Sequence, residues 1–380
     1  QYLVENKERN KNLIYTKSDV LSVSGEYGII NQIEFQGRSF AGESVAEYHV
    51  VETNDIVYTK SPLKANPYGI IKVNNGAPGI VSTLYAVYHP CEGTVAEYID
   101  YYFGNDLRLN KYLKPLVNIG AKHDMKVNNE TVLTGEVYFP GYSEQKKIVG
   151  FLTILDERIR QQRNLVEALK KYKRGVMQHI FRRTTTQSVK AWTCVRLGDI
   201  FKKVSRRNID GLVKNVITNS AEYGLIPQRD FFDKDIAVDG NTANYYVIEK
   251  GDFVYNPRKS NTAPYGPFNR YTLDEKGIIS PLYTCLVLKA DIYPSYLAWY
   301  FKSDAWHRYI YDNGSQGVRH DRVSMTDDLL MGIPVIFPDQ AKQQEYADIL
   351  DKIDARLQAA QKVYDLLIKE KCGYMQQLFI

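Results

Sequence analysis

The chain has 380 residues, of which 44% are hydrophobic and 24% charged, and its formal net charge is +5. This length allows two domains of ordinary size, and no apolar run approaches the length of a transmembrane helix. The first residues, QYLVENKERN, do not have the pattern of a signal peptide. Because they also lack an initiator methionine, we expect the chain to be trimmed at its N-terminus.

The spacing of cysteine and histidine argues against a metal site. The four cysteines are scattered without CxxC spacing, and no two of the six histidines stand at HxxxH spacing. Structural zinc sites are usually built from such close pairs. We therefore expect no metal, and we interpret the cysteines as reduced thiols of a cytoplasmic protein.

Residues 1–143 are predicted to form a first globular region of mixed α/β structure. Residues 50–60 and 80–88 are rich in β-branched and aromatic side chains, which is typical of strands. Residues 94–103 predict a short helix whose first turn is capped by Thr94. Glycine, asparagine and proline interrupt the intervals between these elements.

Residues 144–183 predict a long helix. They contain no proline, and apolar residues recur at alternating steps of three and four. Such a heptad seam needs a partner helix. Gln162 and Lys173 fill the two vacant positions of this seam. Lys173 and Lys371, which lies 198 positions later, both fall on seam positions, where a polar side chain can set the register at a cost in stability or carry its charged end out to solvent. The apolar residues of the seam are Leu152, Leu155, Ile159, Val166, Leu169 and Val176.

The rest of the chain repeats this plan, with a second globular region at residues 184–338 and a second long helix at residues 339–380. A shift of 198 positions carries Leu152 onto Leu350, and EYGII at residues 26–30 recurs as EYGLI at residues 222–226. The offset is 198 positions for the helices and 196 for this motif, and a repeat at so nearly constant an offset indicates two similar halves related by a pseudo-twofold axis. The apolar seam of the second helix comprises Leu350, Ile353, Leu357 and Leu367.

The repeated order, in which a globular region ends at a proline and a long helix follows, resembles the specificity (S) subunit of a type I DNA restriction-modification system. The sequence LGDI at residues 197–200, close behind Trp192, and EYGLI at residues 222–226 add to the resemblance, which covers essentially the whole chain. One departure is Lys342-Gln343 at the start of the second helix, where the family usually has Glu-Gln.

The resemblance implies an α/β protein in which two target-recognition domains are separated by two long antiparallel helices in a coiled coil. Each domain would read one half of a bipartite, asymmetric DNA site. The subunit would have no catalysis and no cofactor of its own. Its partners would be double-stranded DNA, two methyltransferase subunits that carry S-adenosylmethionine and methylate adenine, and restriction-translocase subunits. An alternative from another class is a coiled-coil scaffold for protein interactions without DNA specificity.

The residues themselves give little support to catalysis. Asn256-Pro257-Arg258-Lys259 lacks the second proline and the aromatic residue of the loop that amino-methyltransferases use, and the chain has no GxGxxG turn. This argues against a fused methyltransferase-specificity protein. Glu144 and Lys146 have the spacing of a metal-nuclease motif, but Glu144 opens a helix, where a carboxylate favours the dipole.

Basic residues in loops at matching places of the two halves are the candidates for DNA contact. Loops that contain small residues approach a duplex closely, and cations there contact phosphates or guanine edges in the major groove. The alternative interpretation is that they are solvated surface charges. The predicted DNA-binding residues are Lys60, Lys64, Lys122, His123, Arg258, Lys259, Arg319 and His320.

Overall fold

The computed structural model describes residues 2–60, 63–119, 125–126, 128–186, 192–230, 242–314 and 321–379. The chain divides into two compact units, and each long helix contributes one part to each of them. Unit 1 contains Gln1–Arg163 and Lys362–Ile380, and unit 2 contains Asn164–Gln361. Each unit is described by itself below.

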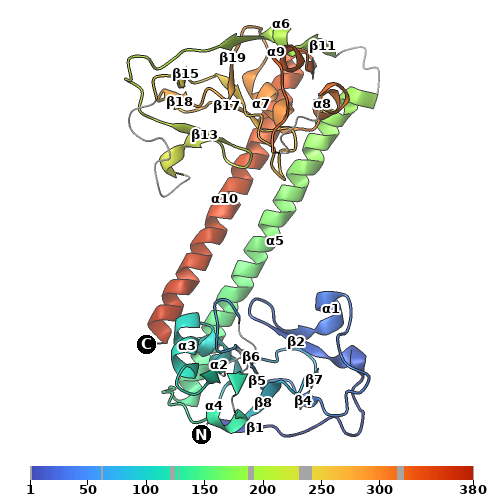
Figure 1. Ribbon diagram of the computed structural model, residues 1–380, viewed down its shortest axis with the longest axis vertical. Coiled ribbons are helices and arrows are strands. Elements are labelled where there is room, and N and C mark those ends of the chain that lie inside the picture. Colours follow the sequence, from blue (N-terminus) through green and yellow to red (C-terminus); the bar gives the residue numbers. More distant parts are fainter. Residues whose placement is uncertain are drawn as a thin grey trace. The chain divides into compact units, whose positions relative to one another are not determined.

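Unit 1 is built on a four-stranded antiparallel sheet with the strand order β1-β8-β5-β6, which can be followed in Figure 1. Two-stranded antiparallel pairs are formed by β2 with β3, β4 with β7 and β9 with β10. The strands are β1 (Leu3–Glu5), β2 (Leu21–Ser24), β3 (Gly28–Asn31), β4 (His49–Val51), β5 (Ile56–Thr59), β6 (Ile71–Val73), β7 (Gly79–Val81), β8 (Tyr85–Pro90), β9 (Asn118–Ile119) and β10 (Met125–Lys126).

Each of the two stretches interpreted as strands contains parts of two strands separated by a turn. Residues 50–60 contain the ends of β4 and all of β5, and the chain turns between them at Asn54, which has a φ of 73°. The Asp55 carboxylate accepts a hydrogen bond of 2.8 Å from the Glu52 backbone N–H, which stabilises this turn. The apolar composition that predicted strands is still explained, because every residue of β5 is buried.

The described part of unit 1 contains five short helices, and three of them follow β8 in the sequence. They are the short 3-10 helix η1 (Lys17–Asp19), α1 (Gln32–Gln36), α2 (Ala96–Phe103), α3 (Asp106–Leu113) and α4 (Asn129–Val132). The expectation that Thr94 caps α2 is wrong. The N-cap residue is Val95, whose side chain cannot cap, and the Thr94 hydroxyl is buried without a hydrogen-bond partner.

Unit 2 repeats this arrangement. Its antiparallel four-stranded sheet has the order β12-β19-β16-β17, and β13 pairs with β14, β15 with β18 and β11 with β20. The strands are β11 (Thr193–Arg196), β12 (Phe201–Val204), β13 (Ile217–Ser220), β14 (Gly224–Pro227), β15 (Tyr246–Ile248), β16 (Phe253–Tyr255), β17 (Phe268–Arg270), β18 (Gly277–Ile279), β19 (Thr284–Leu288) and β20 (Pro334–Phe337). The helices are α6 (Leu197–Ile200), η2 (Gln228–Asp230), α7 (Pro294–Lys302), α8 (His307–Asn313) and α9 (Asp327–Met331).

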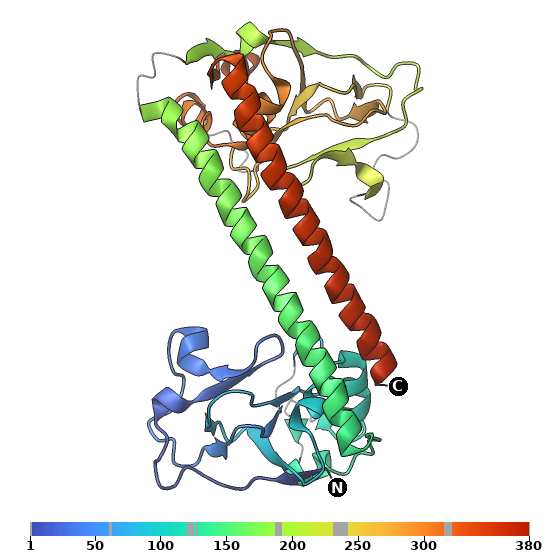
Figure 2. The same cartoon turned by 180° about the vertical axis from the view of Figure 1, so that it is seen from behind.

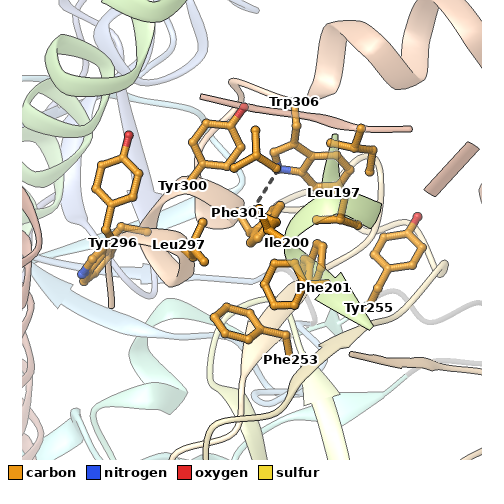
Figure 3. Close-up of a cluster of buried hydrophobic side chains, with 14 of the residues drawn as sticks. Leu197, Ile200, Phe201, Phe253, Tyr255, Tyr296, Leu297, Tyr300, Phe301 and Trp306 are labelled. Carbon is orange, nitrogen blue, oxygen red and sulfur yellow. Dashed lines mark hydrogen bonds between the residues drawn. The ribbon is translucent and has the colours of Figure 1, made fainter. Parts of the chain in front are cut away.

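The core of unit 2 lies between its sheet and helices α6 and α7 and is rich in aromatic rings (Figure 3). The Phe268 ring stacks on Phe301 with centroids 4.0 Å apart. The Trp306 indole is 1% exposed and donates a hydrogen bond of 3.1 Å to the Phe301 carbonyl. Large rings bury much apolar surface, and a buried indole N–H needs such a partner. This core holds the LGDI residues of α6 and the start of β12 in place.

The two long helices are α5 (Tyr142–Thr186) and α10 (Gln340–Leu378), shown from opposite sides in Figures 1 and 2. Among the expected seam residues, Leu152, Leu155, Val166 and Leu169 on α5 and Leu350, Ile353 and Leu367 on α10 are buried, and Ile159, Val176 and Leu357 are half-buried. In unit 1 the Phe151 ring meets Tyr374 and Asp156 meets Lys371. In unit 2 Lys173 meets Asp354, and the later residues Ile180 and Phe181 of α5 share a core with the earlier residues Ala347 and Leu350 of α10. Within each unit the helices therefore run antiparallel, and the prediction of a mixed α/β protein with a repeated long helix is confirmed.

Candidate nucleic-acid interface

A buried glutamine at the start of each long helix joins that helix to the globular region before it. The Gln145 amide oxygen accepts a hydrogen bond of 3.0 Å from the Val95 N–H, which opens α2, and its nitrogen donates to the Pro140 carbonyl at 2.8 Å. In unit 2, Gln343 makes the same two bonds, each of 2.8 Å, with the Tyr293 N–H at the start of α7 and with the Pro338 carbonyl. These glutamines cap α2 and α7, in place of the side-chain cap that sequence analysis assigned to Thr94.

We expect Gln343→Leu to lower the free energy of unfolding by about 2–4 kcal/mol. Leucine has a similar size, but it leaves the Tyr293 N–H and the Pro338 carbonyl buried without partners, and each such group costs about 1–3 kcal/mol. Thermal or urea unfolding measures the effect. The matched variant is Gln344→Leu at the next, exposed position of α10, which should change stability little. Equal losses from both variants would show that the hydrogen bonds of Gln343 are not what matters.

The seam lysines form repeat-related ion pairs. Lys371 pairs with Asp156 in unit 1, and Lys173 pairs with Asp354 in unit 2. Each ammonium group also lies near an aromatic ring of the globular region, Tyr101 at 5.6 Å in unit 1 and Trp299 at 5.1 Å in unit 2. A charged residue at a seam position is tolerated because the facing carboxylate and the ring compensate it.

The loops that follow β5 and β16 are fixed by equivalent contacts. The Tyr58 hydroxyl donates a hydrogen bond of 2.7 Å to the Tyr68 carbonyl, and the Tyr255 hydroxyl donates one of 2.7 Å to the Tyr265 carbonyl. Each loop then closes at a glycine with positive φ, Gly69 at 90° and Gly266 at 85°. These contacts hold the loop ends while the residues between them differ, which is the arrangement expected of recognition loops on a rigid scaffold.

The structure places four of the predicted DNA-binding residues. The Lys60 ammonium group hydrogen-bonds the Asn129 side chain of α4, and burial lowers its pKa. Lys64 is exposed, and Arg258 and Lys259 are exposed in the loop after β16. The other four residues, Lys122, His123, Arg319 and His320, lie outside the described residues.

The loop after β16 is joined to the chain that follows Arg319 and His320. The Lys259 N–H donates a hydrogen bond of 2.9 Å to the Asp321 carbonyl, and Arg258 forms a β-bridge with Arg322. This brings Arg258 and Lys259 next to Asp321 and Arg322, the first described residues after that segment.

Sequence analysis did not identify Arg322 or Tyr283 at this place. The Arg322 Nε is buried without a hydrogen-bond partner, with the Asp321 carboxylate 3.6 Å away. Burial raises the pKa of the Tyr283 hydroxyl, which the charges of Arg258 and Arg322 lower in part. A third cation beside Arg258 and Lys259 strengthens the positive field that a phosphate would meet. The one feature of the sequence that could have indicated Arg322 is that this basic residue directly follows His320-Asp321.

Comparison with solved structures identifies the fold. A type I restriction-modification system S subunit from M. genitalium superposes with a TM-score of 0.56 and 14% sequence identity, covering 100% of this chain and 93% of that one. The chain has the fold of a type I restriction-modification S subunit. A second chain, from a structure on complex assembly and conformational transition of the type I R-M system, superposes on this chain with a TM-score of 0.52 and 16% identity, covering 100% of this chain and 95% of that one. No protein-family model and no curated protein sequence matches the chain.

The part of the chain that the structure describes has neither a metal cluster nor a membrane-spanning helix. No group of three or more metal-ligating side chains comes together there. Its helices also include none with the length and hydropathy needed to cross a membrane.

Proposed function

We propose that the protein is the DNA-reading subunit of a type I restriction-modification complex. The observation that carries this proposal is the repetition of one framework with different loops. Equivalent glutamine, tyrosine and glycine contacts hold the same positions in both units. The loops between them carry different residues, such as Lys64 in unit 1 and Arg258 and Lys259 in unit 2. Two such modules are suited to reading two different half-sites, and the S-subunit fold supports the same conclusion.

In this proposal the globular part of each unit reads one half of an asymmetric DNA site, and the helix pair sets the unread spacer. The subunit has no catalysis of its own. Two methyltransferase subunits bind S-adenosylmethionine and methylate an adenine in each half-site after flipping it out of the duplex. Restriction-translocase subunits complete the complex. The chain contributes the sequence preference, through cations that contact phosphates and base edges.

The test is to produce the chain with its methyltransferase subunits in a host and to map methylated adenines across the genome. A single bipartite motif with a fixed spacer is the expected result. A host in which no new methylated motif appears would contradict the proposal. The alternative function, a protein-interaction scaffold, is separated by salt titration, because DNA binding through phosphates must weaken steeply as salt rises.

Arg319→Ala tests the division of labour between the units. Arg319 lies two positions before Asp321, whose carbonyl is bonded to the loop after β16. If Arg319 makes a bidentate base contact, binding weakens by about 1–3 kcal/mol, and specificity relaxes only in the half-site assigned to unit 2. Binding to libraries of randomised sites measures this. Relaxed specificity in both half-sites would disprove separate reading, whereas a uniform loss would make Arg319 a phosphate contact.

A further inference from the structure

Unit 2 contains a groove of about 460 Å³ between α5 and the segment that joins α7 to α8. We call it the basic groove, because Lys170, Lys173 and Arg174 of α5 line one side and Lys302 of α7 lines the other. Gln178, Thr262 and Ser303 add uncharged polar groups, and Asp304 is the one carboxylate among the described residues that line it.

Part of this positive charge is not neutralised inside the protein. Lys173 pairs with Asp354, and Lys170 pairs with Glu167 at 2.9 Å. Among the described residues, no ion pair is recorded for Arg174 or Lys302. The Lys302 ammonium lies 4.6 Å from the centre of the Trp299 ring. Partial burial of this ammonium lowers the pKa of Lys302 and the nearby Lys173 lowers it further, while Asp354 and Asp351 oppose the shift. An anion in the groove would compensate the crowded cations.

Unit 1 has the repeat-related groove with the opposite charge. It has a volume of about 830 Å³, and Gly104 and Cys372 stand where the basic groove has Lys302 and Arg174. Its two lysines are paired with carboxylates, Lys72 with Asp100 at 3.4 Å and Lys371 with Asp156. The other carboxylates that line it are those of Glu26 and Glu97. The shared framework therefore does not require the cations of unit 2, so a role outside folding explains them better.

The basic groove is continuous with the recognition loop of unit 2. Thr262, which lines the groove, belongs to the loop that carries Arg258 and Lys259 and closes at Gly266. A phosphate chain that passes Arg258 and Lys259 can therefore continue toward Lys302 and Arg174. This continuity favours a nucleic-acid backbone over an acidic protein segment as the occupant.

We propose that the basic groove binds backbone phosphates of the DNA that flanks the half-site read by unit 2, and that unit 1 lacks this contact. The inference rests on the proposed function. Lysine and arginine donate hydrogen bonds to phosphate oxygens without sequence preference. The groove thus adds affinity and orientation on one side of the asymmetric site and leaves base discrimination to the loops.

The test uses the complete complex with its methyltransferase subunits and the double variant Arg174→Gln/Lys302→Gln. Each phosphate contact contributes about −0.9 to the slope of log K against log salt concentration. The slope should therefore become shallower by up to about 1.8, while the ratio of binding to the methylated motif and to a motif with one base changed stays the same. Each of the two residues has solvent-exposed surface, and a thermal melt checks that the variant is folded.

Two matched variants separate local from general effects of charge. Arg174→Lys/Lys302→Arg keeps both charges and should keep the wild-type slope. Lys362→Gln/Lys369→Gln removes two charges from exposed positions of α10 in unit 1 and should also leave the slope unchanged. An unchanged slope in the groove variant would overturn the inference. So would weaker assembly with the methyltransferase subunits at an unchanged slope, which would identify an acidic protein segment as the occupant.

The proposed function is judged separately, by the wild-type complex alone. If that complex shows no preference for any motif, the proposed function fails. A slope that still becomes shallower only in the groove variant would then show that the basic groove contacts phosphates without sequence reading.

Discussion

Replacing Gly266 by alanine should abolish recognition of the half-site assigned to unit 2. Gly266 has a φ of 85°, and a Cβ added there would lie 2.0 Å from the Asn256 carbonyl oxygen. Real Cβ atoms do not approach a backbone oxygen so closely, so the loop that carries Arg258 and Lys259 must move. The unfavourable φ adds roughly 1–2 kcal/mol for a residue with a Cβ. Loss of methylation at the motif, measured by sequencing, together with a lower melting temperature, is the expected result.

Gly224→Ala is the matched control for this substitution. Gly224 also lies in unit 2 and has a φ of 76°, but a Cβ added there meets nothing within 4 Å. Alanine at position 224 should therefore cost only the φ penalty and leave both half-sites recognised. Gly69→Ala is the corresponding change in unit 1, where the added Cβ would lie 1.9 Å from the Thr59 carbonyl oxygen. It should affect the other half-site. Equal behaviour of Gly266→Ala and Gly224→Ala would show that the close approach at Gly266 does not matter.

An insertion of two residues after Leu169 should unfold or strongly destabilise the protein. At 3.6 residues per turn, two residues rotate the following part of α5 by about 200°. Ile180 and Phe181, which are buried in the core of unit 2, would then point away from it. The same rotation would separate Lys173 from Asp354. Each large apolar side chain removed from a core costs about 1.5–3 kcal/mol. Removing a few of them therefore costs more than the free energy of unfolding of a typical protein. Circular dichroism during heating measures it.

An insertion of seven residues at the same position should instead be tolerated. It preserves the heptad phase and lengthens α5 by about 10 Å. Since base pairs are about 3.4 Å apart along each DNA strand, the unread spacer should grow by at most about three base pairs, with both half-sites unchanged. Part of the extra length can slide past the unaltered α10, so a spacer that grows by fewer than three base pairs also agrees with the prediction. Methylation mapping gives the spacer. A folded, active complex with the original spacer would show that the helices do not set it.

The repeated plan of this protein and its long helices can be predicted from the amino-acid sequence alone. A fixed offset between Leu152 and Leu350, and apolar residues at steps of three and four, are sufficient to predict two paired helices, because each helical position repeats the same local geometry. Strands were predicted within residues 50–60 and 80–88 and are present there, but the turns that divide these stretches were not predicted. Asn54 separates β4 from β5 because a side chain, the Asp55 carboxylate, binds the backbone of the turn, and an apolar run conceals such a contact.

The contacts of single polar residues cannot be predicted in this way, because they depend on the tertiary structure. Nothing near Gln145 or Gln343 in the sequence shows that their amides cap α2 and α7, because the bonded backbone groups lie about fifty positions earlier. Lys60 is predicted as a DNA contact from its loop, and only the structure shows that its ammonium hydrogen-bonds Asn129 on α4. The basic groove likewise exists only because folding places Lys302 beside Arg174. Such sites depend on distances between segments that are far apart in the chain. The periodicity of apolar residues, in contrast, describes only residues that are close together in the sequence.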